Sequence, residues 1–413
     1  MRTDFEEAYL QTRQGQRANE ILRSCVHCGF CNATCPTYQL TGDELDGPRG
    51  RIYLMREFLQ TGANDVRTVN HLDRCLTCRA CESTCPSGVA YAELAEIVRS
   101  EIGPRRDGLQ GWLRRVLTFA IPEVRRLRRL VALGRWFRWM LPESLASHLK
   151  TRTAEVPRPH MTRPEKTVLL LDGCVQRVNT PATNAVLESL LASRGVASVR
   201  APDEGCCGSF ELHAGDEPQA LERIRHNIDA IYPLLGGVEA VVSTASGCGV
   251  TVKDYGRLLA HDADYAAKAR DVSDKTMDVS KYLVLMSGRG VTWERSESVS
   301  VDGAQDRVSR VDKVAWHSPC TLQHGQRVSG NVEKLLQGAG YELVPVRDAH
   351  LCCGSAGSYS ILQPEMADKL RERKLSSLQQ HGAGVIATAN IGCQSHLSGA
   401  ARVPVVHWIE LLK

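Results

Sequence analysis

Residues 25–36 read CVHCGFCNATCP, and residues 75–86 read CLTCRACESTCP. Both stretches have the pattern C-x2-C-x2-C-x3-C-P, in which four cysteines fall within eleven residues and a proline follows at once. The proline fixes its own φ and restricts the residue before it, so each loop changes direction directly after its fourth cysteine. Spacings this short bring several thiols of one loop around a common point. The two stretches therefore decide the fold of the N-terminal part of the chain.

The spacing is typical of sequences that bind two 4Fe-4S clusters, in which the fourth cysteine of each run ligates the other cluster. We therefore expect one cluster to be held by Cys25, Cys28, Cys31 and Cys85, and the other by Cys75, Cys78, Cys81 and Cys35. A pair of zinc sites is the alternative, because C-x2-C is also the spacing of zinc ribbons. A ribbon, however, needs two knuckles separated by a longer loop, which neither stretch has.

A turn and a helix are expected between the two cysteine stretches. Residues 47–51 read GPRGR and lead into residues 52–59, which have the pattern of an amphipathic helix. Helices around two cysteine loops predict a compact α-helical module. Arg49, Arg51 and Arg56 either offset the negative charge of thiolate-ligated clusters or form a solvated basic face.

The other eight cysteines form a second repeat on a larger scale. Cys174, Cys206, Cys207 and Cys248 correspond to Cys320, Cys352, Cys353 and Cys393. The offset is 146 residues for the first three pairs and 145 for the last, and both units contain the sequence CCGS. Such regularity indicates a duplication.

Each repeat alternates apolar β-branched runs with segments of helical period, such as residues 184–193 and 331–337. That alternation predicts βαβ units and a mainly parallel sheet. The cysteines come just after the expected strands, at the edge where an open α/β sheet usually binds its ligand. We expect them to form redox or metal sites. The alternative is that they are ordinary buried cysteines, which are common in protein cores.

The expected fold class is multidomain, with an α-helical two-cluster ferredoxin module followed by two duplicated α/β domains with mainly parallel sheets. At 413 residues, 43% of them hydrophobic, the chain is long enough for several domains with cores of their own. The expected boundaries are residues 1–100 for the ferredoxin-like module, 101–164 for a basic helical connector, 165–287 for the first Cys-Cys-Gly repeat domain, 288–311 for a linker and 312–413 for the second repeat domain.

We expect a cytoplasmic protein. No apolar run approaches the roughly eighteen residues of a membrane span, and residues 1–17 lack the apolar segment of a secretory leader. In a reducing cytosol, sixteen cysteines favour metal binding or redox chemistry over a disulfide framework. The net charge is only +4, from 51 basic and 47 acidic residues.

The connector differs from the rest of the chain in its charge. Residues 104–142 contain ten arginines, two acidic residues and three of the six tryptophans, with a net charge of +8, and apolar residues recur at helical spacing on both sides of Pro122. Such a segment is a candidate for contact with an anionic membrane surface, here the inner face of the cell membrane. An interface with an acidic partner subunit or with the chain's own domains is the alternative. Nucleic acid is not an expected partner, because no nucleic-acid-binding motif accompanies the charge.

Several features together resemble one family. These are the cysteine stretches, the segment GDELDGPRGR at residues 42–51, the two Cys-Cys-Gly repeats, and TANIGC at residues 388–393. The sequence resembles the iron-sulfur subunit of bacterial glycolate oxidase, also called glycolate dehydrogenase, over nearly the whole chain. The wider architecture is also similar to the small subunit of anaerobic glycerol-3-phosphate dehydrogenase and to heterodisulfide-reductase-type thiol/disulfide enzymes.

The resemblance implies the electron-transfer subunit of an enzyme complex. Flavin-binding glycolate oxidase subunits would oxidise glycolate to glyoxylate, with D-lactate as a further candidate substrate, and this chain would pass the electrons to an unknown acceptor. The residues agree with that division, because no G-x-G-x-x-G follows an expected strand. We therefore expect no flavin in this chain and assign it no catalytic residue.

The repeats depart from the heterodisulfide-reductase-type pattern, in which the last cysteine of each repeat belongs to a C-x-x-C pair. Ala245 and Asn390 stand where the first cysteine of that pair would be, so each repeat keeps four thiols. Four thiols suit an additional metal, an ordinary cluster or a redox-active dithiol, and these alternatives stay open. His317 and His324 flank Cys320 and are candidate ligands, but we expect them to have a hydrogen-bonded structural role.

Overall fold

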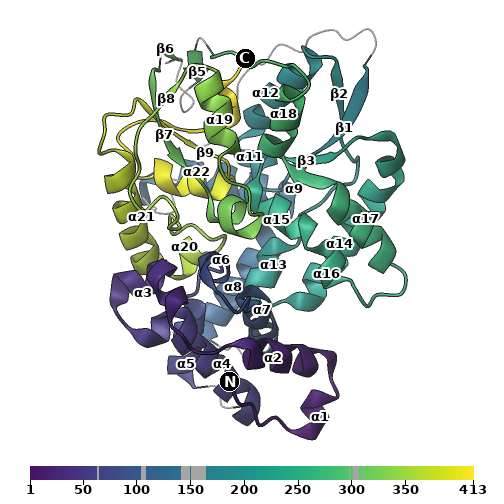
Figure 1. The fold of residues 1–413 in the computed structure, drawn as a ribbon, viewed down its shortest axis with the longest axis vertical. Coiled ribbons are helices and arrows are strands. Elements are labelled where there is room, and N and C mark those ends of the chain that lie inside the picture. The colour runs from purple at the N-terminus through teal and green to yellow at the C-terminus, as the bar shows by residue number, and fades with distance from the viewer. Residues whose placement is uncertain are drawn as a thin grey trace.

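The computed structural model shows a helical N-terminal module at one end of the molecule and two α/β units standing side by side on it (Figure 1). The fold class predicted from the sequence is confirmed. The structure describes residues 1–62, 65–103, 108–140, 149, 164–296, 298–300, 307–309 and 311–413. The parts of the expected connector and linker that lie outside the described residues are 104–107, 141–148, 150–163, 297, 301–306 and 310.

The N-terminal module consists of short helices around the cysteine loops. The Thr12 side chain accepts a hydrogen bond from Gly15 N at the start of α2, and Pro36 and Pro48 occupy the first turns of α3 and α4. Helices α2, α4 and α7 share a core that includes the fully buried Leu94. The elements are α1 (Glu7–Leu10), α2 (Arg13–Ser24), η1 (Phe30–Thr34), α3 (Pro36–Thr41), η2 (Glu44–Asp46), α4 (Pro48–Thr61), α5 (Val66–Asp73), α6 (Ala80–Thr84) and α7 (Tyr91–Ile102).

Two helices of the connector pack against the rest of the chain. Leu127 lies in an apolar cluster with Val178 of the first α/β unit, and the buried Arg114 forms an ion pair of 2.8 Å with Asp73 of the module. Pro122 separates the helices, as the sequence predicts. Within the described part of the chain, no helix combines the length and the apolar character that crossing a membrane requires. The connector elements are α8 (Gly108–Ala120), α9 (Val124–Trp136) and η4 (Arg138–Met140).

The first α/β unit contains a parallel sheet with the strand order β2-β1-β3-β4. Alternate residues of its central strand β1 enter two different clusters, because helices cover both faces of the sheet: Val168 and Leu170 point to one, Leu169 and Leu171 to the other. The strands are β1 (Lys166–Leu171), β2 (Val196–Val199), β3 (Val241–Ser243) and β4 (Thr276–Asp278). The helical elements are α11 (Gln176–Asn179), α12 (Pro181–Ala192), α13 (Ser209–Ala214), α14 (Glu217–Ile231), η6 (Tyr232–Gly237), α15 (Ser246–Lys253), α16 (Tyr255–Leu258), α17 (Ala266–Lys275) and α18 (Val279–Ser287).

The second α/β unit repeats this plan, with the parallel strand order β10-β9-β7-β8. The duplication extends to the strand register, because His317 pairs with Thr388 just as Leu171 pairs with Ser243. A short antiparallel pair, β5 (Ser298–Ser300) and β6 (Arg307–Ser309), falls within the residues expected to be a linker. The strands are β7 (Lys313–His317), β8 (Glu342–Leu343), β9 (Val385–Thr388) and β10 (Val405–His407). The helical elements are η7 (Thr321–Gly325), α19 (Asn331–Gly338), α20 (Tyr359–Leu362), α21 (Pro364–Leu378), α22 (Ile391–Ser398) and η8 (Trp408–Leu411).

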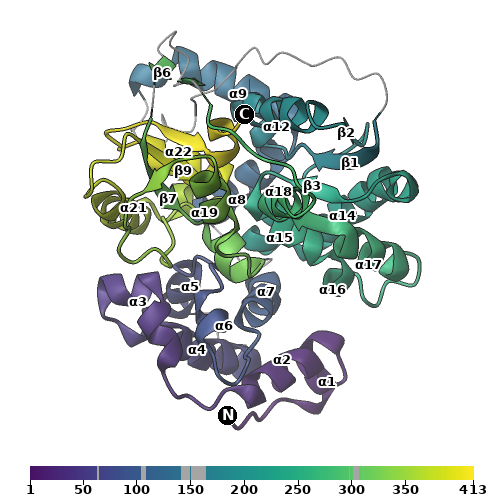
Figure 2. The ribbon, with the colours of Figure 1, turned by 45° about the horizontal axis from the view of Figure 1, so that its top comes forward.

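The two α/β units share one hydrophobic core. Val168 and Tyr282 of the first unit and Val314, Val406 and Trp408 of the second belong to the same buried cluster. Helix α18 packs against α19, and α12 packs against η8. Figure 2 shows the two units next to each other above the N-terminal module. The sequence predicts two duplicated repeat domains, and in the structure an apolar interface joins the two α/β units.

Candidate metal centres

The two N-terminal cysteine loops lie against each other. Thr34 Oγ1 of the first loop donates to Ala80 O of the second at 3.3 Å, and Thr84 Oγ1 donates to Thr34 Oγ1 at 3.2 Å. Short helices end or begin at the cysteines: Cys25 follows α2, and Cys35 and Cys85 follow η1 and α6. The two cysteine loops are therefore close enough for a cysteine of one loop to reach the site formed by the other.

Equivalent residues of the two loops have the same unusual backbone conformation. His27 and Thr77 have φ values of 55° and 51°, and Gly29 and Arg79 have values of 83° and 60°. A positive φ is a strained conformation for a β-branched residue such as Thr77, and strain of this kind persists where the surroundings impose it. Its recurrence indicates that both loops are shaped to surround an object of the same form.

The first set of cysteines surrounds a small cavity. Cys25, Cys28, Cys31 and Cys85 line it together with Cys81. Burial, together with the nearby Cys25, Cys28 and Cys85 when they are ionised, raises the pKa of Cys31 to about 11. Thiols this close cannot all ionise without a cation between them, so the donor set fits a thiolate-ligated metal cluster. At this cavity, Cys85 of the second loop therefore lies together with three cysteines of the first loop.

The second set of cysteines surrounds a neighbouring cavity. Burial raises the pKa of Cys81 well above its usual value, and the adjacent Cys78 and Cys75 act in the same direction. Burial also opposes ionisation of Cys75, but Arg51 and Arg99 outweigh it and hold the pKa of Cys75 below its usual value. Two cations next to buried thiols indicate a site built to keep thiolates. The cysteines that line this cavity are Cys35, Cys75, Cys78 and Cys81.

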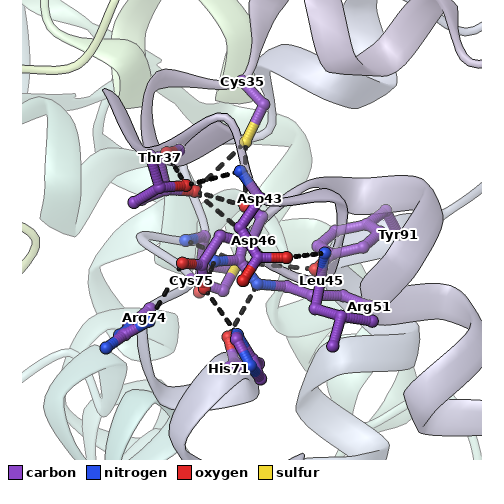
Figure 3. A network of polar contacts seen from close by, with 12 residues as sticks. Cys35, Thr37, Asp43, Leu45, Asp46, Arg51, His71, Arg74, Cys75 and Tyr91 are labelled. Atoms are coloured by element: carbon purple, nitrogen blue, oxygen red, sulfur yellow. Dashed lines mark hydrogen bonds and ion pairs between the residues drawn. The ribbon is translucent and has the colours of Figure 1, made fainter. Parts of the chain in front are cut away.

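Arg51 connects the second cysteine set to the module core (Figure 3). Only 1% of its surface is exposed, and it donates from Nε to His71 O at 2.7 Å and from Nη1 to Thr37 Oγ1 at 3.1 Å. Thr37 Oγ1 lies 3.2 Å from Cys35 Sγ. The guanidinium is therefore held beside the sulfur atoms by fixed hydrogen bonds.

Asp46 balances the charge of Arg51. Its carboxylate, also 1% exposed, lies 3.5 Å from Arg51 Nη2, 2.9 Å from His71 Nδ1 and 3.0 Å from Arg74 Nη1. Sequence reasoning did not identify Asp46 or His71. The sequence feature that could have pointed to this contact is Asp46 itself, within the segment at residues 42–51, because a buried aspartate needs a cationic partner.

The other two arginines singled out from the sequence, Arg49 and Arg56, make different contacts. Arg49 forms an ion pair with Glu44 at 2.6 Å, and the Arg56 guanidinium lies 4.2 Å from the centre of the Tyr53 ring. The sequence left open whether these arginines offset thiolate charge or form a solvated basic face. The structure supports the first interpretation for Arg51 at the second cavity, and Arg49, although paired with Glu44, also lines the first cavity.

The four cysteines of each α/β unit come together at the carboxyl edge of the sheet. Cys174 Sγ lies 3.5 Å from Cys206 Sγ, and Cys320 Sγ lies 3.8 Å from Cys352 Sγ. The thiols of Cys207 and Cys353 each interact with the first cysteine of their pair and with the last cysteine of their repeat. The hydrogen bond to Cys206, together with burial, raises the pKa of Cys174 well above its usual value. Each repeat thus presents a continuous row of four sulfur atoms.

The glycine after each cysteine pair is required by the backbone. Gly208 and Gly354 have φ values of 85° and 93°. A Cβ atom on Gly354 would lie 2.8 Å from Ala367 O, and one on Gly208 would lie 3.1 Å from Ala220 O. Helices α21 and α14 therefore pack directly on the loops that hold the cysteine pairs, and a side chain at either glycine would displace a pair.

Both rows of cysteines open into one cavity, of about 260 Å³, where the two α/β units meet the N-terminal module. Cys78 lines this cavity as well as the second module cavity. Burial raises the pKa of Cys78, and the next largest effect comes from Cys320 of the second repeat. The repeat cysteines that line the cavity are Cys174, Cys206, Cys207, Cys248, Cys320, Cys352, Cys353 and Cys393.

The two histidines near Cys320 differ from each other. His324 has a structural role, as expected, since Nδ1 lies 2.9 Å from Ser83 Oγ and Nε2 lies 2.9 Å from His350 O. The same expectation is wrong for His317, which is 1% exposed and whose ring nitrogens have no hydrogen-bond partner among the residues that the structure describes. The sequence could not separate the two, because only the tertiary structure shows which ring meets a partner.

The residues that replace the additional cysteines are also placed by the structure. Asn390 Nδ2 donates to Cys393 Sγ at 3.7 Å, whereas Ala245, at the equivalent place in the first repeat, is buried and has no side-chain donor. The two rows of sulfur atoms therefore have different surroundings.

Comparison with known proteins identifies two domain families in the chain. The sequence matches the 4Fe-4S dicluster domain family over residues 21–89 and the CCG cysteine-rich domain family over residues 168–253 and 314–398. A solved structure of a hypothetical protein from Helicobacter pylori matches 97% of this chain and 72% of its own, with a TM-score of 0.51 and 9% identity, which supports the fold alone.

Two relatives match the full length of the chain. The glycolate oxidase iron-sulfur subunit of Escherichia coli is 44% identical over 100% of this chain and 98% of its own length. The probable glycolate oxidase iron-sulfur subunit of Bacillus subtilis is 30% identical over the same shares of the two chains. The chain therefore belongs to the family of glycolate oxidase iron-sulfur subunits, the electron-transfer subunits of an oxidoreductase.

Proposed function

We propose that this chain is the electron-transfer subunit of a glycolate oxidase complex. In this proposal, a flavin-binding partner subunit oxidises glycolate to glyoxylate, and D-lactate is a further candidate substrate. The oxidation removes two electrons and two protons from the substrate, and this chain accepts the electrons and passes them to a further acceptor. The observation that carries the proposal is the pair of adjoining cysteine cavities in a chain that is 44% identical to a glycolate oxidase iron-sulfur subunit.

We assign one 4Fe-4S cluster to Cys25, Cys28, Cys31 and Cys85 and the other to Cys75, Cys78, Cys81 and Cys35. When bound, such clusters supply reversible one-electron transfer. The chain's own residues keep the ligands ionised: Arg51 and Arg99 offset the thiolate charge at Cys75, and Tyr91 OH donates to Cys75 Sγ at 3.6 Å. The grouping of the sulfur atoms around two cavities supports the assignment.

The exposure of the cysteines suggests a direction for electron transfer. Of the sixteen cysteines, all of which the structure describes, Cys28 alone is exposed. Its neighbours Val26 and Phe30 are 67% and 62% exposed, so this end of the module offers an apolar surface to a partner. At the other end, Cys78 faces the large cavity of the repeats. We propose that electrons enter from the flavin subunit near Cys28 and leave toward that cavity.

Anaerobic purification tests the cofactor assignment. Two 4Fe-4S clusters should give about eight irons per chain and a broad absorbance band at about 400 nm. Co-expression with flavin-binding subunits should restore glycolate-dependent dye reduction, which the isolated chain should lack. Stoichiometric zinc in place of iron would overturn the assignment.

A thiol/disulfide enzyme is the second candidate, because eight thiols line a single cavity. This function predicts that the isolated chain reduces a disulfide and that replacing Cys207 or Cys353 by serine abolishes the reaction. If the isolated chain reduces no disulfide while the assembled complex reduces a dye with glycolate, the electron-transfer function stands alone.

For the connector we propose contact with an anionic membrane surface. The face of the connector that does not pack on the protein carries exposed aromatic residues, since Trp112, Trp136 and Trp139 are 56%, 86% and 82% exposed. Arg125 and Arg129 of α9 are exposed as well. Tryptophan with arginine on one face suits the boundary between headgroups and acyl chains.

A further inference from the structure

His317 stands out among the buried polar residues of the repeats. It ends strand β7, has 1% of its surface exposed, and neither ring nitrogen has a hydrogen-bond partner among the described residues. A buried imidazole without a partner costs free energy, so its retention calls for a ligand. A ring nitrogen of His317, Cys353 Sγ and Cys393 Sγ all lie within 4.8 Å of one another.

The first repeat serves as an internal comparison. Leu171 occupies the position of His317, because both residues end the first strand of their repeat, both pair with the same position of the neighbouring strand, and both precede a cysteine by three residues. Leu171 packs with Cys207 in an ordinary apolar cluster. The fold of the repeat therefore does not need a histidine at this place, and the histidine of the second repeat has a separate cause.

We propose that His317, Cys353 and Cys393 bind a single divalent metal ion of the zinc type. Two thiolates and one imidazole form the donor set of open, tetrahedral zinc sites, in which a fourth position is left for water or another ligand. Each thiol gives up its proton to solvent when it binds, and the imidazole binds in its neutral form. Two thiolates then neutralise the charge of the ion, so no net charge is buried.

The surroundings of the three residues fit such a site. Cys353 and Cys393 line the large cavity and His317 does not, so the ion would be held from the strand side and its fourth position would face the cavity. Asn390 Nδ2 donates to Cys393 Sγ at 3.7 Å, as a residue that orients a metal ligand does. The first repeat has neither the histidine nor the amide, because Leu171 and Ala245 stand in their places.

A metal ion at this site makes the two repeats chemically different. Its binding does not depend on which substrate the partner subunit oxidises or on the clusters of the module. The second repeat holds a mononuclear site that opens into the cavity, whereas within the described part of the chain the cysteines of the first repeat form no such group with a histidine.

The test uses the full chain, purified anaerobically with its iron in place and supplied with one equivalent of zinc sulfate. Zinc analysis should give about one ion per chain, and X-ray absorption at the zinc edge should show sulfur neighbours at about 2.3 Å and a nitrogen neighbour at about 2.0–2.1 Å. A wild-type spectrum without a nitrogen neighbour, or iron in place of zinc at these cysteines, would overturn the proposal. This part of the test needs no variant.

Two histidine variants then locate the nitrogen. His317→Leu copies the residue of the first repeat and should weaken zinc binding at least about tenfold, whereas His324→Asn, which alters a hydrogen-bonded histidine of the same region, should leave zinc binding unchanged. His317→Cys should retain the ion with three sulfur neighbours. Unchanged iron content in all three variants shows that the chain is folded, and zinc binding by His317→Leu equal to that of the wild type contradicts the proposal.

Discussion

Replacing Arg51 by methionine is expected to lower the reduction potential of the second cluster by about 100 mV. Thr37 Oγ1 lies 3.1 Å from Arg51 Nη1 and 3.2 Å from Cys35 Sγ, so the guanidinium is within about 6 Å of this sulfur atom. At that distance and an effective dielectric constant near 20, the interaction between the guanidinium and one unit of cluster charge is worth about 2–3 kcal/mol. A cation favours the more negative, reduced state. Its removal therefore lowers the potential, and the other cluster, whose cavity Arg51 does not line, should change less.

The same substitution should also weaken the module. His71 O and Thr37 Oγ1 lose their donor, and the buried Asp46 retains only His71 and Arg74 as partners, a loss of about 3–5 kcal/mol by analogy with broken buried ion pairs. Arg51→Lys separates the two effects, because it keeps the charge but not the hydrogen-bond geometry. It should lose stability with only a small change in potential.

The assay is a redox titration followed by electron paramagnetic resonance, with iron content measured on the same samples. Arg56→Met is the matched control, since Arg56 lies on the same helix but stacks on Tyr53. If Arg51→Met retains its full iron content and shifts neither potential by more than Arg56→Met does, the charge-compensating role of Arg51 is refuted.

Four further predictions follow from the geometry. Cys28→Ser should reduce the iron content from about eight to about four per chain and abolish glycolate-dependent turnover of the complex, and undiminished turnover would contradict a role in electron transfer. Gly354→Ala should destabilise the second repeat by about 2–4 kcal/mol in thermal unfolding, because the backbone strain of a positive φ adds to the overlap of the new Cβ atom with α21. Gly340→Ala is the control: Gly340 also has a positive φ, of 90°, but open space around it, so its replacement should cost about 1–2 kcal/mol. Equal effects of the two substitutions would exclude the overlap with α21. Burial raises the pKa of Glu204 from 4.5 to about 7, so the native state binds the proton more tightly than the unfolded chain and loses stability as the pH rises from 4.5 to 7. Glu204→Gln should remove this pH dependence of the melting temperature. An unchanged pH dependence in the variant would refute the role of Glu204. Replacing Trp136 and Trp139 by alanine should reduce sedimentation of the complex with anionic vesicles, and unchanged sedimentation would remove the membrane proposal.

The cysteine spacing predicted much of the candidate sites because ligand sets of this kind are local. Cys25, Cys28 and Cys31 belong to one loop, and their short spacing already requires the sulfur atoms to be neighbours. The place of Cys85 beside them could be predicted only from the known exchange of fourth cysteines between paired runs. The parallel sheets followed from apolar runs such as residues 167–171, which helices cover on both faces.

The remaining features depend on contacts between segments far apart in the chain. Asp46 meets His71 and Arg74 only after α4 and α5 have packed, and no local pattern marks that meeting. His317 and His324 are both neighbours of Cys320 in sequence, but only His324 reaches a serine of the N-terminal module. The shared core of the repeats was also not predicted, because an apolar strand pattern does not say which unit its covering helices belong to.

The shared core also constrains how this chain can evolve. Val168 and Tyr282 of the first repeat belong to the same buried cluster as residues of the second, so deletion of either repeat would expose apolar surface of the other to water. Recombination that exchanges one repeat for that of a distant relative must therefore preserve both sides of the interface at once. The repeat cysteines themselves lie outside this core, although Leu322 and Ala389 of the neighbouring loops belong to it. The duplicated halves are thus inherited as a single unit, and a change of ligand in one half must keep the interface with the other.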